Sequence, residues 1–415
     1  MKYDVVIIGG GLSALTAGIT LASNGKRVCM VAAGQNSLHF SSGSFDFLGY
    51  DADGNAVTNP IEAIKTLPTI HPYRIIGEEN IGSLVTSAQA LLSDAGVETK
   101  GEIAQNHYRI TPIGTIKPTW LTIEGYATAA SLTETRWKKA DLINIQGFLD
   151  FPIEFLVDNL RDTGTTCTIR NINTEALTQA RKSPTEMRAT NVAKYLDSKT
   201  DLMDFANAIN AIDSDAEVVL VPAVLGLNNS AQAEELKALV KKPIEFIATM
   251  PPSVSGMRTS TLLKRKFMAL GGTILVSDTA VSGVFENNRL VSIATSQLPD
   301  EVLRADQFIL ASGSFLSHGL KSDYEKVYEP VLGVDVEAVA NRVEWTKENV
   351  YDAQPYMEFG VKTDAQFHAL KEGVAIENLY AAGSILCGNN DIKLASKEGV
   401  AMLTALQVAN IIKEK

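Results

Sequence analysis

The chain opens with a glycine-rich turn that lies between a short apolar strand and an apolar helix. Residues 3–8 form a β-branched run, Gly9 to Gly11 interrupt it, and apolar residues then recur at helical spacing over residues 12–22. A second strand is predicted over residues 27–31. Two such strands joined by a helix pair in parallel through a right-handed crossover. We therefore predict an α/β fold with a parallel, Rossmann-like FAD/NAD(P)-binding sheet.

The turn itself matches the phosphate-binding pattern G-x-G-x-x-[G/A]. Gly9 permits the tight turn, Gly11 lets the backbone approach phosphate oxygens, and Ala14 allows the helix to pack closely on the strand. The amino-terminal end of the helix attracts negative charge. Gly9, Gly10, Gly11 and Ala14 are thus predicted to bind the phosphate of a nucleotide cofactor. The alternative is a glycine-rich turn that binds no ligand.

One part of the dinucleotide pattern is missing. An Asp or Glu is expected about 20 residues after the glycines, where it binds the adenosine ribose. No acidic residue lies between Asp4 and Asp46, and the second strand runs into Ala32-Ala33-Gly34. Either the cofactor lacks an adenosine half, as FMN does, or FAD or NAD is held by other contacts. NAD is disfavoured, because its adenosine ribose depends most on that carboxylate.

A second segment, near the carboxyl end, favours flavin over nicotinamide. Residues 377–383 (ENLYAAG) are typical of the closing strand of FAD-dependent oxidoreductases, with Ser384 where an acid is usual. A helix is predicted from Gly399 to residue 412, and its amino-terminal end could face the electron-rich edge of a flavin. Gly383, Ser384 and Gly399 are therefore predicted flavin contacts. An ordinary strand, turn and helix is the alternative.

The order of these segments predicts a discontinuous nucleotide-binding domain. Residues 1–70 form its first part, residues 71–250 an inserted α+β cap or substrate domain, and residues 251–415 its return, with the helix that contacts flavin. With 415 residues, 45% of them hydrophobic, the chain can bury a large core.

Charge and cysteine content exclude several classes of function. A formal net charge of -11 repels phosphate backbones, so nucleic acid is not an expected partner. Cys29, Cys167 and Cys387 are too few for an iron–sulfur cluster or another metal site of the chain's own, and they suit a reducing, cytoplasmic setting. No apolar run reaches about 18 residues, so a partner would have to supply any membrane contact.

Several blocks of sequence resemble the B subunit of the bacterial anaerobic glycerol-3-phosphate dehydrogenases, flavoproteins of the FAD-dependent oxidoreductase and fumarate reductase-like class. The resemblance extends from end to end. Its blocks are LHFSSGS at 38–44, RITPIGTIKPTWL at 109–121, PPSVSGMR at 251–258, ASGSF at 311–315, EPVLGVDV at 329–336 and FGV at 359–361. One departure is residues 389–398 (NNDIKLASKE), where relatives tend to be rich in glycine.

The resemblance implies a protein that binds FMN, or alternatively FAD, in a complex that oxidises sn-glycerol 3-phosphate to dihydroxyacetone phosphate. Electrons would pass to menaquinone in fumarate or nitrate respiration. The implied partners are an FAD-containing subunit of the same complex and an iron–sulfur subunit that contacts the membrane. The chain would then be cytoplasmic and held through a partner at the inner face of the membrane.

The same chemistry suggests candidate side chains. Oxidation of a secondary alcohol needs a base near the hydroxyl group and cations for the phosphate. His39 and Arg258 are the predicted catalytic residues, and Arg109 and Lys117 are further candidate cations. Four neighbouring small residues are predicted to hydrogen-bond the flavin, namely Ser41, Ser42, Gly43 and Ser44.

For each of these side chains a solvated loop position or a structural cation remains an alternative. Three functions also remain open. These are a catalytic flavin subunit, a scaffold or electron-transfer subunit of the same complex that performs no catalysis, and an FAD-dependent dehydrogenase of another small alcohol.

Overall fold

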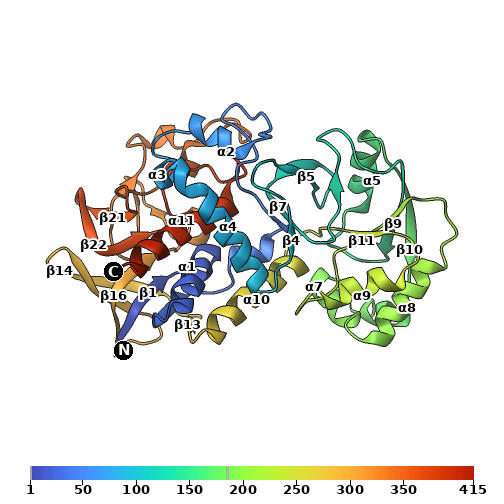
Figure 1. Ribbon diagram of the computed structural model, residues 1–415, viewed down its shortest axis with the longest axis horizontal. Helices are drawn as coiled ribbons and strands as arrows, with labels where there is room; N and C mark the ends of the chain where they lie inside the picture. The colour runs from blue at the N-terminus through green and yellow to red at the C-terminus, as the bar shows by residue number, and fades with distance from the viewer. Residues whose placement is uncertain (1, 184, 186) are drawn as a thin grey trace. The chain divides into compact units, whose positions relative to one another are not determined.

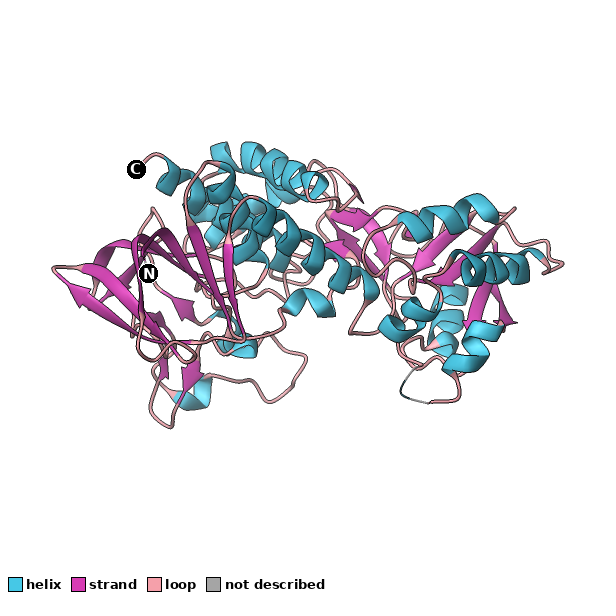
Figure 2. Ribbon diagram, turned by 90° about the horizontal axis from the view of Figure 1, so that it is seen from below, coloured by secondary structure: helices cyan, strands magenta, loops and turns pink. Residues whose placement is uncertain are grey.

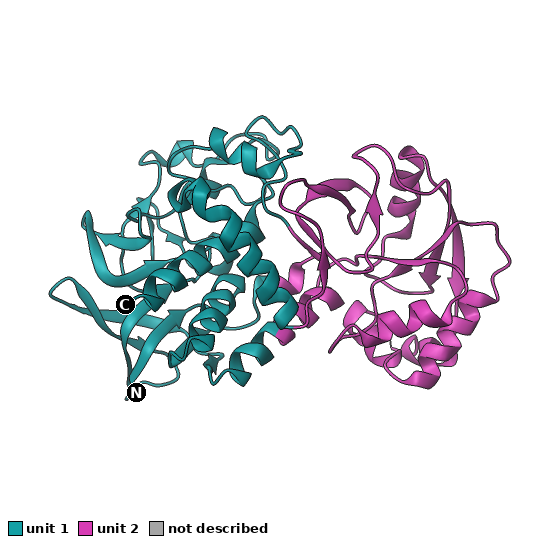
Figure 3. Cartoon of the chain, in the orientation of Figure 1, with its two compact units in different colours: residues 1–37, 46–95, 263–415 teal, residues 38–45, 96–262 magenta. Residues whose placement is uncertain are grey.

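The computed structural model describes residues 2–183, 185 and 187–415, and the chain forms two compact units (Figure 3). Unit 1 comprises residues 1–37, 46–95 and 263–415, and unit 2 comprises residues 38–45 and 96–262. These boundaries differ from the predicted ones at 70/71 and 250/251. The difference arises because α3 (Pro72–Ile76) and α4 (Glu78–Asp94) pack against α11 (Lys397–Lys413), which belongs to unit 1.

A mixed sheet organises unit 1. Its strand order is β13-β2-β1-β16-β15-β14, with β22 also paired to β16 and β21 to β22. The central strands β13, β2, β1, β16 and β22 pair in parallel, whereas β14, β15 and β21 add antiparallel pairs. The strands of this sheet are β1 Lys2–Ile8, β2 Val28–Ala32, β13 Thr273–Val276, β14 Ala280–Glu286, β15 Arg289–Thr295, β16 Val302–Leu310, β21 His368–Lys371 and β22 Val374–Ala381.

Helices cover one face of this sheet (Figure 2). α1 (Leu12–Ser23) packs against α11, and α11 packs in turn against α3 and α4, so that α1, α11 and α4 lie side by side (Figure 1). α11 buries side chains around most of its circumference, which explains its nearly continuous apolar sequence. The remaining elements of unit 1 are α2 Pro60–Ala63, β17 Lys321–Ser322, β18 Val327–Tyr328, β19 Val336–Glu337 and β20 Gly360–Val361.

Local sequence signals account for several boundaries. The hairpin between β14 and β15 turns at Asn287 and Asn288, both in the left-handed region at φ 49° and 59°, which asparagine tolerates better than most residues. α10 (Val254–Ala269) begins two residues after Pro252, ahead of the apolar residues that recur at helical spacing from residue 259 on. Ser253 explains this start, because its Oγ accepts a hydrogen bond of 3.0 Å from the Gly256 N–H and so caps the first turn.

Unit 2 combines one parallel sheet with two small antiparallel sheets. The parallel sheet has the order β10-β9-β11-β12, and helices connect its strands, as parallel pairing requires. The antiparallel sheets are β3-β7-β4 and β6-β5-β8. The elements of unit 2 before α10 are β3 Ser44–Phe45, β4 Thr99–Lys100, β5 His107–Ile110, β6 Ile116–Thr119, β7 Leu121–Ile123, β8 Thr128–Ala129, β9 Lys139–Ile145, α5 Ile153–Asp162, β10 Thr166–Ile172, α6 Glu175–Ala180, α7 Ala189–Tyr195, α8 Lys199–Asn210, β11 Val218–Pro222, α9 Ala231–Leu239 and β12 Ile244–Ile247.

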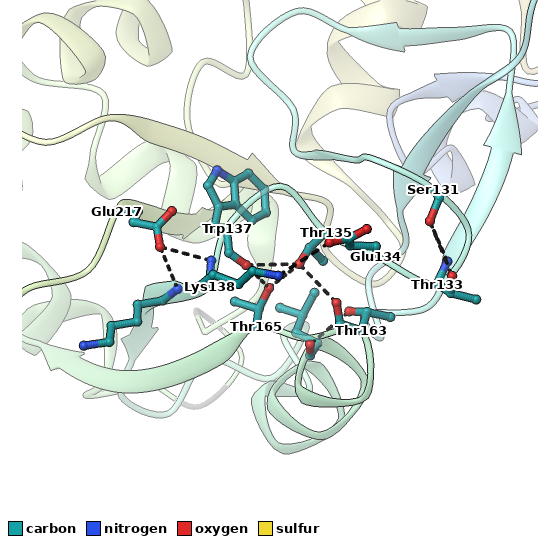
Figure 4. A network of polar contacts seen from close by, with 11 residues as sticks. Ser131, Thr133, Glu134, Thr135, Trp137, Lys138, Thr163, Thr165 and Glu217 are labelled. Carbon is teal, nitrogen blue, oxygen red and sulfur yellow. Dashed lines mark hydrogen bonds and ion pairs between the residues drawn. The ribbon is translucent and has the colours of Figure 1, made fainter.

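A polar network fixes the entry to this parallel sheet (Figure 4). The hydroxyls of Thr135 and Thr165 hydrogen-bond each other, and Thr165 Oγ1 donates to the Trp137 carbonyl at 2.8 Å. The Glu217 carboxylate accepts the N–H groups of Lys138 and Lys139 at 3.1 and 3.3 Å. These bonds join the starts of β9, β10 and β11, so the network sets strand register and is structural.

Candidate functional site

The glycine turn of unit 1 lies at the carboxyl end of β1. Gly9 adopts φ +132°, and a Cβ there would lie 2.1 Å from the Ala311 carbonyl oxygen, so only glycine fits. Its N–H donates to the Val31 carbonyl at 2.9 Å. Gly10 is similarly confined, since a Cβ would lie 2.6 Å from the Ala32 Cβ. The turn is therefore packed tightly between the ends of β2 and β16.

Gly11 differs from its two neighbours, because a Cβ at this position would meet no atom within 4 Å. Gly11 is also the N-cap of α1, and no side chain caps this helix end. Backbone N–H groups at an uncapped helix start form a ready site for an anion. Open space beside Gly11 and uncapped N–H groups are what the phosphate end of a nucleotide requires, so these residues fit such a group.

The closing strand β22 meets the glycine turn, which unites two segments that are far apart in sequence. A Cβ on Gly383 would lie 2.0 Å from Ser13 Oγ. The Gly383 N–H donates to Thr404 Oγ1 of α11 at 2.9 Å. Gly383 thus lies among α1, β22 and α11, beside the predicted phosphate site.

The end of β2 offers no carboxylate in the position that usually binds an adenosine ribose. Asp278 follows the neighbouring strand β13, and its N–H donates to the Ala32 carbonyl at the end of β2. Its Oδ1 accepts hydrogen bonds from Thr279 N, Ser296 Oγ and Gln297 N at 2.8 to 3.1 Å. Burial opposes ionisation, yet the hydrogen bonds hold the pKa of Asp278 below its usual value. The Asp278 carboxylate is therefore already hydrogen-bonded by residues that surround it.

At the start of α11, backbone and side-chain groups are already hydrogen-bonded to Asp46 of the same chain. The Gly399 N–H donates to the Asp46 carbonyl at 3.0 Å, and a Cβ on Gly399 would lie 2.1 Å from Tyr73 Oη. The Glu398 carboxylate accepts the Asp46 N–H at 3.3 Å. Burial, together with the nearby Asp46 charge, raises the pKa of Glu398 to about 7. The Gly399 N–H is thus already engaged and is not free for a flavin.

Within residues 389–398, Asn389 and Ser396 form a buried polar cluster with His71 that sequence reasoning did not find. His71 is fully buried, its Nδ1 accepts the Tyr73 N–H at 3.1 Å, and its Nε2 therefore donates to Asn389 Oδ1 at 3.0 Å. Ser396 Oγ donates to the same Oδ1 at 2.7 Å. Burial raises the pKa of Asp391, opposed by a hydrogen bond from Ser384. The only sequence signal was the unusual polarity of this segment.

In unit 2, residues of the blocks at 109–121 and 251–258 hydrogen-bond the serine loop, residues 38–45. Arg109 Nη1 donates to Ser42 Oγ at 2.8 Å. Ser253 Oγ donates to the Ser41 carbonyl, and the Ser253 N–H donates to the His39 carbonyl at 3.0 Å. Gly43, at φ +81°, lies against the Tyr126 ring. The structure therefore holds the predicted loop in one defined conformation.

The predicted cations differ in their surroundings. Arg109 is buried, whereas Lys117, its partner in the β5–β6 register, is exposed. Arg258 is 7% exposed, and its Nη1 donates to the carbonyl oxygens of Leu225 and Gly226 at 3.0 and 2.6 Å. The predicted base, His39, is half-buried in a short 3-10 helix.

The predicted site residues accordingly fall into two groups. In unit 1 the structure brings Gly9, Gly10, Gly11, Ala14 and Gly383 to the carboxyl edge of the sheet. In unit 2 it brings together Ser41, Ser42, Gly43, Ser44 and Arg109. Each group is a coherent cluster within its own unit.

Comparison with known proteins defines the class. Residues 4–392 match the family described as FAD binding domain. A solved structure of 3-ketosteroid delta1-dehydrogenase from Sterolibacterium denitrificans covers 100% of this chain and 99% of its own, at 10% identity and a TM-score of 0.45. With the glycine turn at the end of β1, the family match makes the chain a flavoprotein with an FAD-binding domain, and the predicted α/β Rossmann-like fold is confirmed.

The particular family follows from relatives that match over their full length. The B subunit of anaerobic glycerol-3-phosphate dehydrogenase from Yersinia pseudotuberculosis is 40% identical, over 99% of this chain and 98% of the relative. Its counterpart in Yersinia enterocolitica is 41% identical over the same shares, and that of Actinobacillus succinogenes is 35% identical. The chain belongs to this family, the B subunits of the anaerobic glycerol-3-phosphate dehydrogenases.

Burial raises the pKa of each thiol, Cys29, Cys167 and Cys387, to about 11, so these cysteines are poor nucleophiles and metal ligands at neutral pH. Among the helices in the described part of the chain, none has the length and apolar character needed to cross a membrane.

Proposed function

We propose that this chain is the flavin-dependent subunit that oxidises sn-glycerol 3-phosphate to dihydroxyacetone phosphate, with electrons passed through partner subunits to menaquinone. The observation that carries the proposal is the uncapped start of α1 beside the open space at Gly11. It occurs in a chain that is 40% identical, over nearly its whole length, to a subunit of this dehydrogenase.

The proposed cofactor is FMN, held at its phosphate by the backbone of Gly9 to Gly11 and by the first turn of α1, where Ala14 allows close packing. Two features support FMN over FAD: no carboxylate follows β2, and Asp278 is committed to its own loop. When bound, a flavin supplies the acceptor for the hydride of the alcohol carbon. Gly383 and Ser384 would line the same edge of the sheet.

The proposed substrate contacts lie in unit 2. The His39 imidazole would accept the proton of the substrate hydroxyl, and the Arg258 guanidinium would bind the phosphate. The hydroxyls of Ser41, Ser42 and Ser44, which lie with Gly43 in the serine loop, would donate hydrogen bonds to the flavin. The Arg109 bond to Ser42 supports this role, because it fixes the loop before any ligand binds.

The proposed partners follow the division of labour in the family. An FAD-containing subunit and an iron–sulfur subunit at the membrane would complete the complex, and the chain would be cytoplasmic and peripheral to the inner face of the membrane. The relatives are named as one lettered subunit of their enzyme, which supports the existence of partners. The three cysteines, each with a thiol pKa raised to about 11, fit a chain that leaves iron–sulfur chemistry to a partner.

A second candidate function is electron transfer or scaffolding, without catalysis, in the same complex. The start of α11 favours it. The Gly399 N–H donates to the Asp46 carbonyl, and a second carboxylate, Glu398, lies beside Asp46. A reduced flavin carries negative charge at the edge that such a helix start would stabilise, and a carboxylate there would disfavour reduction.

The deciding experiment is to purify the chain, release its cofactor by heat, identify it by chromatography, and titrate the intact protein anaerobically with sn-glycerol 3-phosphate. FMN that is bleached by the substrate supports the first function. Bleaching of this FMN only after the FAD-containing subunit is added supports the second. FAD overturns the choice of FMN, and bleaching by another small alcohol but not by glycerol 3-phosphate overturns the substrate.

A matched pair of variants tests where the flavin binds. Gly11→Asp adds a carboxylate beside the uncapped start of α1 and should reduce bound flavin at least about tenfold through charge repulsion. Gly82→Asp adds the same charge at an exposed position of α4, where a Cβ also meets no atom within 4 Å. It should retain full flavin content. Equal flavin content in both variants would contradict the proposed phosphate site.

A further inference from the structure

A cavity of about 120 Å³ lies within unit 2, beside a smaller one of about 20 Å³. Both are lined by Glu124, Ser230, Glu234 and Arg258, from the β7–β8 loop, the start of α9 and α10. We propose that these two cavities, which share the four lining residues, together bind a small phosphorylated polyol, with its phosphate at Arg258 and its hydroxyls at the two glutamates. This rests on the function proposed above only for the identity of the polyol, glycerol.

The charge of Arg258 calls for an anion. The side chain is 7% exposed, and its hydrogen bonds run from Nη1 to the backbone carbonyls of Leu225 and Gly226. Within the described residues no carboxylate forms an ion pair with it, and Nε and Nη2 have no hydrogen-bond partner. Burial lowers the pKa of this guanidinium. A buried cation without a counter-charge is unfavourable by several kcal/mol, and a bound phosphate would supply that charge.

Glu124 and Glu234 disfavour a ligand that consists of phosphate alone. Glu124 and Glu234 are exposed and line both cavities, and Glu98 lines the larger one. Glu124 Oε1 accepts the Gly125 N–H at 3.2 Å, and Glu234 Oε1 pairs with Lys237 Nζ at 2.9 Å. Carboxylate oxygens accept hydrogen bonds from hydroxyl groups and repel phosphate. A ligand that suits the whole cavity therefore carries an anion at one end and hydroxyls at the other.

The volume limits the ligand to a few carbons. A protein cavity of roughly 150 Å³ accepts benzene, which has six heavy atoms. The larger cavity alone thus suits the six heavy atoms of a three-carbon triol. The smaller cavity, which Arg258 also lines, adds room at the cationic end. Glycerol 3-phosphate matches this division into a polyol and a phosphate.

Calorimetric titration of the intact, purified chain tests the proposal, with sn-glycerol 3-phosphate, glycerol and inorganic phosphate as separate ligands. We expect glycerol 3-phosphate to bind at least about tenfold more tightly than either fragment. Arg258→Gln should weaken its binding at least about tenfold, since the variant removes the charge-assisted contact. Arg265→Gln, which removes the same charge from an exposed position of the same helix, should leave binding unchanged.

A second variant guards against misfolding of Arg258→Gln. Ser230 is the N-cap of α9 but makes no side-chain cap bond, so Ser230→Phe should fill the cavity without loss of a cap. It should abolish binding while circular dichroism stays unchanged. Wild-type affinity in both the Arg258→Gln and Ser230→Phe variants would overturn the proposal, and so would phosphate binding as tightly as glycerol 3-phosphate.

The two proposals fail in different ways. Binding that depends on Arg258 in a chain without flavin would retain this site and overturn the catalytic role. Flavin bleached by substrate, with binding unaffected by Arg258→Gln, would retain the oxidation of substrate by this chain, and it would overturn both this site and the phosphate contact proposed for Arg258.

Discussion

Gly383 faces Ser13 so closely that a Cβ on Gly383 would lie 2.0 Å from the serine Oγ. The two residues are 370 positions apart, at the end of β22 and in the first turn of α1. Their approach brings the closing strand to the glycine turn, so the proposed phosphate site depends on segments that are far apart in the sequence.

Gly383→Ala should therefore destabilise unit 1 by about 2 to 4 kcal/mol, because the Cβ overlaps Ser13 Oγ and the residue has φ +81°. Urea unfolding measures the loss. In a Ser13→Gly background the same substitution should cost about 1 to 2 kcal/mol less, since the overlapping oxygen is gone. Strict additivity of the two changes would show that the contact does not restrict position 383.

Arg109→Gln should loosen the serine loop of unit 2. The variant removes the bond from the buried guanidinium to Ser42 Oγ, which is a charge-assisted contact worth about 1.5 to 3 kcal/mol. We expect faster amide hydrogen exchange over residues 41–45. Lys117→Gln, which alters the exposed cation opposite Arg109 in the same sheet, is the control and should exchange like the wild type.

His71 should make stability depend on pH below neutrality. Burial lowers its pKa to about 4 from 6.5, so the unfolded chain takes up a proton between pH 6.5 and 4 while the folded chain does not. The stabilisation is complete above pH 6.5, and about 2 kcal/mol of it is lost by pH 5. The free energy of unfolding, measured with urea at pH 7.5 and 5, should show this loss.

His71→Gln should lack that part of the pH dependence, so its stability should approach that of the wild type as pH falls. His318→Gln, at an exposed position, controls for the removal of a histidine. A constant difference between wild type and His71→Gln from pH 7.5 to 5 would contradict a neutral, buried imidazole.

Glu398→Gln should stabilise the protein above neutral pH. Burial and the Asp46 charge raise the Glu398 pKa to about 7, above the ordinary 4.5. The stabilisation linked to this group is therefore complete below pH 4.5 and is lost as pH rises to 7. At pH 8 the variant should gain on the order of 2 kcal/mol, and the gain should vanish near pH 4.5. Glu348→Gln, at an exposed position, should show no gain at pH 8.

Much of the fold could be predicted because its signals are local. The glycine turn, the Asn287-Asn288 hairpin and the apolar helix near the carboxyl end each depend on backbone preferences or periodicity within a short window. The start of α10 could not be predicted from periodicity, since it depends on one cap at Ser253 that follows two prolines. The domain boundaries depended on helices α3 and α4, whose packing partner α11 lies some 300 residues further along.

By itself, the sequence determined the class of fold, the position of the glycine turn and the family, because strand periodicity, glycine spacing and shared blocks are all local to the sequence. Only the tertiary structure decided which N–H groups and charges are already engaged. In the tertiary structure the Gly399 N–H donates to the Asp46 carbonyl and the Arg109 guanidinium donates to Ser42. Arg258 lies buried beside a cavity. The physical reason is that hydrogen-bond satisfaction and desolvation depend on neighbours in space, which spacing along the chain does not encode.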